Sequence, residues 1–246
     1  MHETQQSPLL EVRGLSAWYG GAHILFDLDL TVKRGEVVSL MGRNGAGKST
    51  TFLALMGLLP RKSGTVHFMG TDISNAEPYA IAQRGIGFVP EDRRIFTDLT
   101  VMENLNVGRQ PARNWPDGTP LPAWTPERLF ALFPNLAEMP NRSAARMSGG
   151  EQQMLTVARA LMGNPYLVLL DEPSEGIAPV IADEMVAMIL QLKAQGVSVL
   201  LSEQNMHFAE RVSDRAYVLE KGHIRFSGSM QALQADATVR ATFLGV

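Results

Sequence analysis

The chain has 246 residues, 45% of them hydrophobic and 19% charged, which is enough for one large domain or for a domain with an inserted subdomain. Its net charge of −3 gives no electrostatic case for binding nucleic acid or an anionic membrane. The chain has no cysteine, which excludes disulfides and thiolate metal sites.

Membrane-spanning and export signals are not recognisable in the sequence. No stretch approaches the roughly 18 consecutive apolar residues that a membrane-spanning helix requires. The polar N-terminus, Met1 to Pro8, lacks the apolar centre of a signal peptide. We therefore expect a soluble, cytoplasmic protein whose membrane role goes through a partner.

The first 70 residues alternate short β-rich runs with turns. Val37–Met41 is apolar almost throughout, which is typical of a strand buried in a parallel sheet. The stretch Thr50–Leu58 after it favours a helix. Further strands are predicted at 9–12, 23–32 and 65–69, with turns at 33–36 and 61–64.

A phosphate-binding loop joins that strand to that helix. Its glycines allow a tight turn in which consecutive N–H groups point inward at phosphate oxygens, and the helix dipole favours the anion. Lys48 supplies a cation for the β- and γ-phosphates, and Ser49 offers a hydroxyl to Mg²⁺. The sequence therefore predicts a nucleotide site made by Gly42, Arg43, Asn44, Gly45, Ala46, Gly47, Lys48, Ser49 and Thr50.

The composition shifts after a strand that ends at 86–90. Helices are predicted at 98–107, 126–132 and 151–162, and the stretch 110–125, with four prolines, indicates an irregular surface loop. Strands and helices then alternate, which favours a parallel α/β core. Those strands are predicted at 167–170, 197–201 and 216–220, and the helices at 180–194 and 206–212.

The chain is thus predicted to be a single domain, residues 1–246, with an interrupted core. The nucleotide-binding core comprises residues 1–90 and 159–246, and a mostly helical insertion spans residues 91–158.

Two carboxylates follow the apolar strand at 167–170. Buried parallel strands deliver the side chains at their carboxyl ends into the ligand crevice. Asp171 is therefore placed to hold Mg²⁺ opposite Ser49. Glu172 follows near the position of an attacking water and is the candidate general base or water-polarising group.

A second glycine-rich motif precedes the helix at 151–162. Ser148 can act as its N-cap, which leaves N–H groups of the first turn free to bind an anion. The motif begins 23 residues before Asp171, and the combination resembles the ATP-binding cassette (ABC) ATPases over nearly the whole chain. The signature residues of that resemblance are Ser148, Gly149, Gly150, Glu151 and Gln152.

The resemblance implies a fold and an assembly. The fold is α/β, with a RecA-like parallel-sheet core, an N-terminal antiparallel β layer and an inserted helical subdomain. The signature would bind the γ-phosphate of ATP held by a second protomer, so that two ATP molecules lie in a head-to-tail dimer. The resemblance places Tyr19, rather than its neighbour Trp18, against adenine, and it places 174–179 across the dimer interface.

Two positions depart from the family pattern. Glu91 stands where the family usually has a glutamine near Mg²⁺ and the attacking water, and Arg93 or Arg94 could offset the added negative charge. Gln204 stands where the family usually has a histidine on the γ-phosphate, and an amide can donate a hydrogen bond but cannot become a cation. His207 is a weaker candidate for the same task.

These details resemble the second (LivF-like) ATPase subunit of bacterial branched-chain amino acid importers. That resemblance implies ATP and Mg²⁺, a companion ATPase subunit or a second copy of the chain, membrane permease subunits and, indirectly, a periplasmic binding protein. It also implies a location at the inner face of the membrane. The residues that carry it lie at 90–96, 147–154, 174–179 and 203–205.

Three other functions remain open. The chain could serve an importer of urea or short-chain amides, because the ATPase subunits of those importers closely resemble those of branched-chain amino acid importers. Non-transport ABC proteins often carry two cassettes or a long coiled coil, and this chain has neither. A weakly hydrolysing, regulatory cassette is favoured by Glu91 and Gln204 and disfavoured by the intact Glu172.

Overall fold

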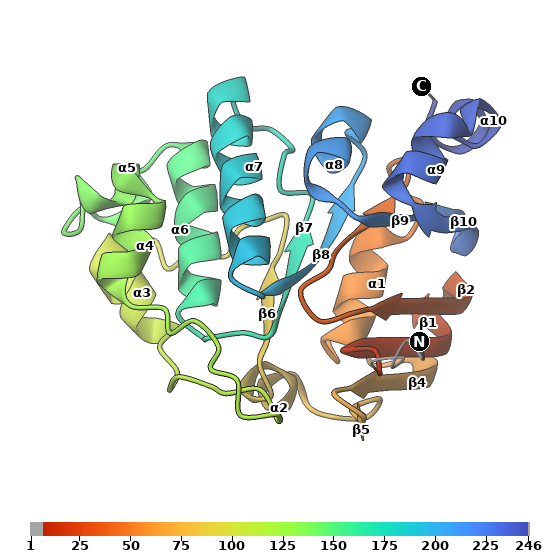
Figure 1. Cartoon of the computed structure of the whole chain (residues 1–246), viewed down its shortest axis with the longest axis horizontal. Coiled ribbons are helices and arrows are strands. Elements are labelled where there is room, and N and C mark those ends of the chain that lie inside the picture. The colour runs from red at the N-terminus through yellow and green to blue at the C-terminus, as the bar shows by residue number, and fades with distance from the viewer. Residues whose placement is uncertain (1–6, 246) are drawn as a thin grey trace, which may run out of the picture.

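The computed structural model describes residues 7–245 and contains two β-sheets that face each other across a layer of helix (Figure 1). The expectation for the polar N-terminus falls on residues 1–8 and so lies largely outside this range. Within it, none of the helices has both the length and the apolarity to cross a membrane.

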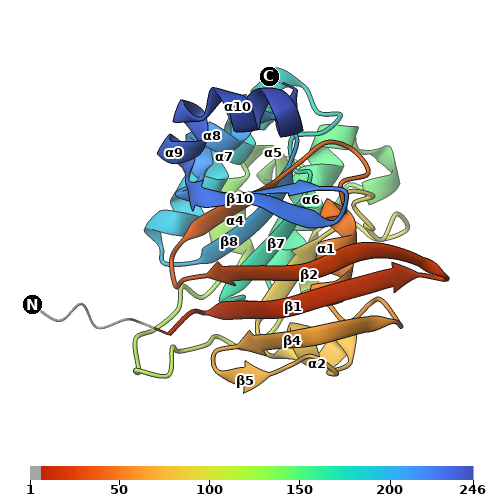
Figure 2. The ribbon, with the colours of Figure 1, turned by 90° about the vertical axis from the view of Figure 1, so that its right-hand side faces the viewer.

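The first sheet is antiparallel and has the strand order β2-β1-β4-β5. Figure 2 shows it as a separate layer on one side of the molecule. Alternate residues of its strands are buried, as expected for a sheet with one covered face. The predicted antiparallel layer is therefore confirmed, and its strands are β1 (Leu10–Tyr19), β2 (Ala22–Val32), β4 (Lys62–Phe68) and β5 (Thr71–Asp72).

The turn predicted at 61–64 is wrong, because β4 begins at Lys62. Gly64 has a φ of +91°, and a Cβ there would overlap the carbonyl group of Gly14 in the neighbouring strand. The glycine therefore serves close strand packing rather than a turn. Strand β1 is also longer than the predicted 9–12, since register shifts after Val12 hide its continuation from a simple alternating pattern.

This explanation predicts a stability difference between two glycines. Gly64→Ala combines an unfavourable positive φ with a backbone clash and should lower the free energy of unfolding by about 3 kcal/mol or more. Gly70→Ala is the matched control, since Gly70 also has a positive φ but has no atom within 4 Å of the added Cβ, and it should cost about 1 kcal/mol. Equal losses in urea denaturation would contradict the close-approach explanation.

The second sheet has the order β10-β9-β3-β8-β7-β6, and its neighbours are parallel except at the β9–β10 edge. Strands β3, β7 and β8 are buried at every residue because both faces are covered. This confirms the parallel core. The strands are β3 (Val37–Met41), β6 (Ile86–Val89), β7 (Leu167–Asp171), β8 (Ser198–Glu203), β9 (Arg215–Glu220) and β10 (His223–Ser229).

Strand β7 divides its side chains between two cores. Leu167 and Leu169 join the cluster beneath the antiparallel layer, which includes Phe52. Val168 and Leu170 join a second cluster with the helical part of the chain. The helices that provide these surfaces are α1 (Lys48–Leu55), α6 (Gly149–Leu161), α7 (Pro179–Ala194) and α8 (Met206–Val212).

The predicted helical insertion is confirmed as a feature of the fold. Its helices share one hydrophobic cluster with the central sheet, so the boundaries 91 and 158 stay a prediction. The remaining helical elements are α2 (Pro78–Gln83), α3 (Val101–Val107), α4 (Pro126–Leu132), α5 (Pro134–Ala137), a 3₁₀ turn η1 (Ala144–Arg146), α9 (Met230–Ala235), α10 (Ala237–Val239) and a short π-helix η2 (Arg240–Leu244).

The loop predicted at 110–125 is irregular, but it is not merely a surface loop. Trp115, Leu121 and Trp124 are buried. The ring centroids of Trp115 and Tyr166 lie 4.8 Å apart, and the guanidinium of Arg34 lies over the Trp115 ring, 4.1 Å from its centroid. The loop therefore contributes apolar side chains to the core while its prolines prevent regular structure.

Candidate functional site

The phosphate loop has the geometry that its sequence predicts. It runs from the end of β3 to the start of α1, and Gly47, with a φ of +112°, is the N-cap of that helix. A Cβ at Gly42 would lie 2.5 Å from the carbonyl oxygen of Leu219, and one at Gly47 would lie 2.7 Å from Leu25. Glycine is thus required at Gly42 because a backbone oxygen lies close, and at Gly47 because of its positive φ.

Lys48 points back into this loop. Its side chain is almost completely buried, and Nζ donates to the carbonyl oxygens of Gly42 at 2.8 Å and Arg43 at 3.2 Å. Nζ also forms an ion pair with Oε1 of Glu172 at 3.0 Å. The loop therefore holds its cation at the point where the carboxyl end of β7 reaches it.

Asp171 ends β7 and faces the start of α1. Its Oδ1 accepts hydrogen bonds from the hydroxyls of Ser49 at 3.2 Å and Ser202 at 2.6 Å. Burial raises the pKa of Asp171, and the hydrogen bonds only partly offset that effect. Among residues 7–245 no basic side chain forms an ion pair with this carboxylate, so none of these side chains balances its charge.

Glu172 has an unusual backbone conformation, with a φ of +46°. Its amide donates to Oγ of Ser202 at 2.9 Å, which fixes the start of the loop after β7. Burial acts to raise the pKa of Glu172, but the hydrogen bond from Glu175 and the ion pair with Lys48 outweigh it, so the pKa lies below its ordinary value. The same hydrogen bond raises the pKa of Glu175 to about 7.

Sequence reasoning missed two buried groups that hold these loops. Ser202 links Asp171 to the amide of Glu172 across the β7–β8 pair. Glu203 accepts from the amides of Ser174 at 3.0 Å and Asn205 at 3.1 Å, and burial raises its pKa. The available signal for Ser202 was its place directly after the apolar run 199–201 of β8.

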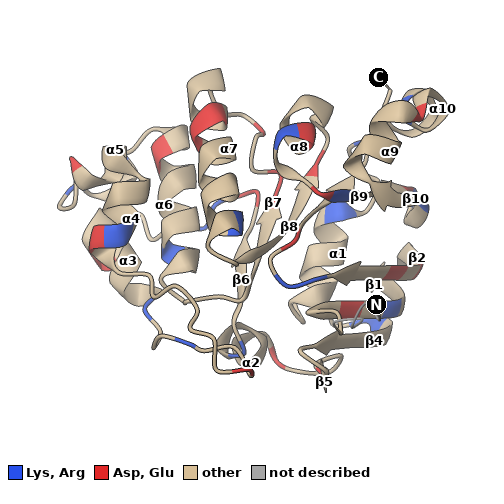
Figure 3. Ribbon diagram, viewed as in Figure 1, with Lys and Arg blue, Asp and Glu red and all other residues tan. Residues whose placement is uncertain are grey.

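Gln204 and Glu91 lie at the same end of the sheet. Gln204 follows β8 and is exposed in a hollow that Glu172, Glu175 and Glu203 also line. Glu91 is exposed on the turn after β6, and its charge contributes to the raised pKa of Asp171. Figure 3 marks acidic positions in red at this end of the central strands. The roles of both residues stay predictions.

The signature motif forms a capped helix start. Oγ of Ser148 accepts from the amide of Glu151 at 3.3 Å, and Oε2 of Glu151 accepts from the amide of Ser148 at 2.6 Å. Helix α6 begins at Gly149, two residues before the predicted start. Ser148 and Gly149 are exposed. Ser148 is therefore the N-cap, as predicted.

The β1–β2 hairpin reaches toward the phosphate loop. Ile24 lines the hollow above Gly45, Lys48 and Glu172. Tyr19, at the end of β1, is half exposed. Trp18 instead stacks on the ring of His23 with 4.3 Å between centroids, so its ring already has a partner.

Comparisons with known proteins decide the family. The family model described as ABC transporter matches residues 25–175, which is more than half of the chain. The chain belongs to the ABC transporter family. Branched-chain amino acid transport ATP-binding protein BraG of Pseudomonas aeruginosa is 41% identical over 96% of this chain and all of its own length.

Further relatives agree with this assignment. The lipopolysaccharide export ATP-binding protein LptB of Escherichia coli is 34% identical over 96% of this chain and 97% of its own. A crystal structure of a nucleotide-free ATP-binding cassette superposes with a TM-score of 0.78 at 28% identity, covering 95% of this chain and 97% of the other. The expected ABC fold is therefore confirmed.

The family assignment gives the clustered residues a substrate. The chain binds ATP and is an ATPase, as ABC transporter ATP-binding subunits are. ABC ATPases work as dimers with membrane permease components. The structure brings Lys48, Ser49, Asp171 and Glu172 together at the phosphate loop. It places the signature at the start of another helix, and none of the described residues that line the phosphate-loop hollow belongs to the signature.

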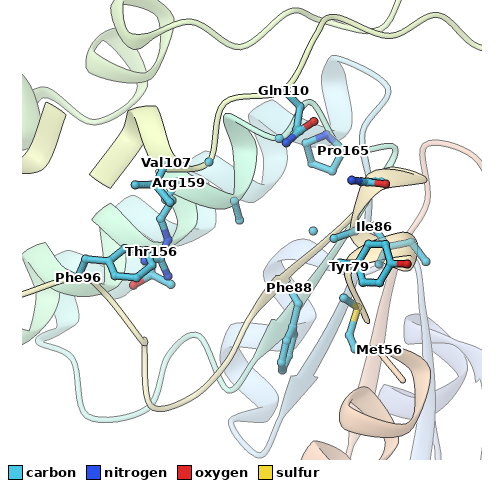
Figure 4. A pocket seen from close by; sticks show the side chains of 16 residues that line it. Met56, Tyr79, Ile86, Phe88, Phe96, Val107, Gln110, Thr156, Arg159 and Pro165 are labelled. Atoms are coloured by element: carbon cyan, nitrogen blue, oxygen red, sulfur yellow. The ribbon is translucent and has the colours of Figure 1, made fainter. Parts of the chain in front are cut away.

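This ABC ATPase also has an apolar groove away from the phosphate loop (Figure 4). The groove has a volume of about 520 Å³, and it lies between the β6–α2 part of the core and the helical part, α3 and α6. Tyr79, Phe96 and Val107 line it and are each about half exposed or more. Arg159 is the one charged side chain among its described lining residues. Large exposed apolar side chains gathered in a groove are typical of a protein-binding surface.

Proposed function

We propose that the chain is the ATP-hydrolysing subunit of a bacterial importer for branched-chain or other hydrophobic amino acids. The observation that carries the proposal is the 41% identity with BraG over 96% of the chain. LptB, an export protein, matches over the same share at 34% identity. The higher sequence identity with BraG favours amino acid transport over lipopolysaccharide export.

Lys48 and Glu172 would perform the central task at the phosphate loop. To bind β- and γ-phosphates, Nζ of Lys48 exchanges the carbonyl and carboxylate acceptors that it has in this structure for phosphate oxygens. That exchange releases Glu172 from its ion pair. The freed carboxylate can then accept a hydrogen bond from the attacking water and polarise it.

The residues around Asp171 fit Mg²⁺. Oγ of Ser49 and Oδ1 of Asp171 are hard oxygen donors 3.2 Å apart, and the carboxylate is buried without a cationic partner in residues 7–245. Glu91 is a third candidate ligand. The described residues contain no cluster of three or more acidic or histidine side chains suited to a metal, which agrees with an ion that shares its ligands with phosphate and water. When bound, Mg²⁺ would neutralise phosphate charge.

The contact with adenine and the second contact with the γ-phosphate would come from opposite protomers. Tyr19, whose ring is half exposed, would stack on adenine bound by its own chain. Ser148, Gly149, Gly150 and the first turn of α6 would bind the γ-phosphate held by the partner protomer, with Glu151 and Gln152 in the same turn. The exposed helix start supports this arrangement, and the partner would be a companion ATPase or a second copy.

The apolar groove would receive a membrane permease subunit. A segment of the permease that occupies the groove, with Tyr79 on one side and Val107 on the other, would touch both the core and the helical part. Closure of the ATPase dimer would therefore move that segment. This contact would hold the chain at the inner face of the membrane. A periplasmic binding protein would act on the permease from the other side, and no role for nucleic acid is proposed.

Uptake by the assembled transporter tests this function. Vesicles would contain this chain, its companion ATPase and both permease subunits, with the binding protein added. We expect ATP-dependent uptake of labelled leucine that Glu172→Gln abolishes. Uptake of urea or acetamide in place of leucine would transfer the assignment to an amide importer. ATP hydrolysis without uptake of any of them would favour a regulatory or non-transport cassette.

Gln204 offers a separate prediction. If Gln204 contacts the γ-phosphate, Gln204→His should raise the ATPase rate several-fold at pH 6, where imidazole is charged, and less at pH 8. Gln204→Ala is the loss-of-contact control and should lower the rate. Steady-state phosphate release at both pH values measures the effect. Unchanged rates and ATP affinities in both variants would exclude a phosphate contact.

A further inference from the structure

Arg93 and Arg94 are adjacent arginines with different surroundings. Both have left-handed backbone conformations, with φ values of +64° and +50°, on the turn that follows β6. The amide of Arg93 donates to the carbonyl of Pro90 at 3.0 Å, and that of Arg94 donates to the carbonyl of Asp92 at 2.7 Å. The turn therefore fixes where each side chain begins.

The charge of Arg94 is balanced, and that of Arg93 is not. Nε of Arg94 pairs with the carboxylate of Asp92 at 2.9 Å. The Arg93 side chain has neither an ion pair nor a hydrogen-bond acceptor among residues 7–245, and its Nε is buried without a partner. The Arg93 guanidinium is therefore without an acceptor among residues 7–245, and its Nη atoms, which are not enclosed like Nε, are the ones that an anion could reach.

The guanidinium of Arg93 lies on the signature. A Cβ at Gly149 would lie 3.0 Å from Nη1, 3.5 Å from Nη2 and 3.6 Å from Cζ. A Cβ at this position would force the guanidinium to shift by a few tenths of an ångström, so the glycine lets the planar group lie against the first turn of α6. Gly149 thus has a use beyond freeing its own N–H group, since it makes room for a cation beside the exposed Ser148.

The groups that meet at this point are mainly hydrogen-bond donors. They comprise the Arg93 guanidinium, the Ser148 hydroxyl and the first-turn N–H groups of α6. The nearby carboxylate of Glu151 is engaged by the amide of Ser148 at 2.6 Å. A guanidinium offers a planar set of donors that matches the several oxygens of a phosphate group.

We propose that Arg93 is a further catalytic residue, whose guanidinium contacts the γ-phosphate of ATP held on the phosphate loop of the opposing protomer. The inference rests on the proposed head-to-tail dimer and adds a cation to its signature. Arg93 would stabilise the charge of the transferring phosphoryl group, and Arg94 would remain paired with Asp92.

Neighbouring substitutions test the role of the charge. Arg93→Ala should lower the ATPase kcat of the dimer about a hundredfold and leave the affinity of the single chain for a fluorescent ATP analogue unchanged. Arg94→Ala is the matched control and should hydrolyse ATP within about twofold of wild type. Arg93→Lys should recover part of the rate and exclude a folding defect. Wild-type turnover by Arg93→Ala would overturn the inference.

Mixed dimers of this chain test whether Arg93 acts on the partner's ATP. Lys48→Ala is expected to bind ATP about a hundredfold more weakly but still carries Arg93, so excess Lys48→Ala should restore hydrolysis by the Arg93→Ala chain. Excess Lys48→Ala/Arg93→Ala should not. Equal restoration by both, or by neither, would overturn the proposal. Ser148→Arg separates the head-to-tail dimer from the role of Arg93. If Ser148→Arg leaves hydrolysis intact, the proposed dimer itself is wrong. If Ser148→Arg abolishes hydrolysis but Arg93→Ala does not, the dimer is supported and only the role of Arg93 is wrong.

Discussion

Replacing Glu172 by glutamine should reduce ATP hydrolysis by about 10²–10³-fold while ATP still binds. The amide keeps the size of the side chain but cannot carry the negative charge that polarises the attacking water. Lys48 also loses its ion-pair partner, so phosphate oxygens meet less competition for Nζ and ATP affinity should hold or rise. Phosphate release and binding of a fluorescent ATP analogue measure the two effects.

The control for Glu172→Gln lies three residues further on. Glu175→Gln makes the same chemical change in a residue that shares a hydrogen bond with Glu172 and lines the same hollow. Because Glu175 is exposed and does not contact Lys48, its variant should retain hydrolysis within a few-fold of wild type. Turnover by Glu172→Gln within threefold of wild type would refute the assignment of Glu172.

Replacing Lys48 by alanine should affect both ATP binding and stability. Loss of the phosphate-binding cation should weaken ATP binding by about 10²-fold or more, since hydrogen bonds to charged groups contribute roughly 1.5–3 kcal/mol each. The substitution also leaves the buried Glu172 without its partner. Breaking such a pair from one side costs about 3–5 kcal/mol of unfolding free energy in buried sites.

A double variant separates those two losses. Lys48→Ala/Glu172→Gln removes the unpaired charge and should regain most of the unfolding free energy, but it should not regain ATP affinity. Urea denaturation gives the first quantity and calorimetric titration with ATP the second. If the double variant is as unstable as Lys48→Ala alone, the ion pair is not the cause of the instability.

The residues that sequence alone located are those whose chemistry depends on local spacing. The phosphate loop lies between a strand and a helix that adjoin it in the chain, so its geometry follows from a few consecutive residues. Asp171 and Glu172 follow one apolar strand in the same way, and Ser148 caps the helix that it directly precedes. Each of these patterns is complete within about ten residues.

What sequence reasoning missed depends on contacts between distant segments. Ser202 lies opposite Asp171 only because β7 and β8 pair in parallel. Glu203 braces the loop after β7 from the neighbouring strand. Strand β10 escaped detection because its exposed edge mixes small and polar residues. The contact between Arg93 and Gly149 likewise joins segments more than fifty residues apart.

The central claim is that two protomers share each ATP site. The most direct test is to measure the ATPase rate per chain as the concentration of the second protomer is raised. The second protomer is this chain itself or the companion subunit. A shared site predicts that the rate per chain rises with that concentration until dimers saturate, and that Ser148→Arg abolishes the rise without weakening ATP binding. A rate per chain that is independent of concentration and unaffected by Ser148→Arg would contradict it.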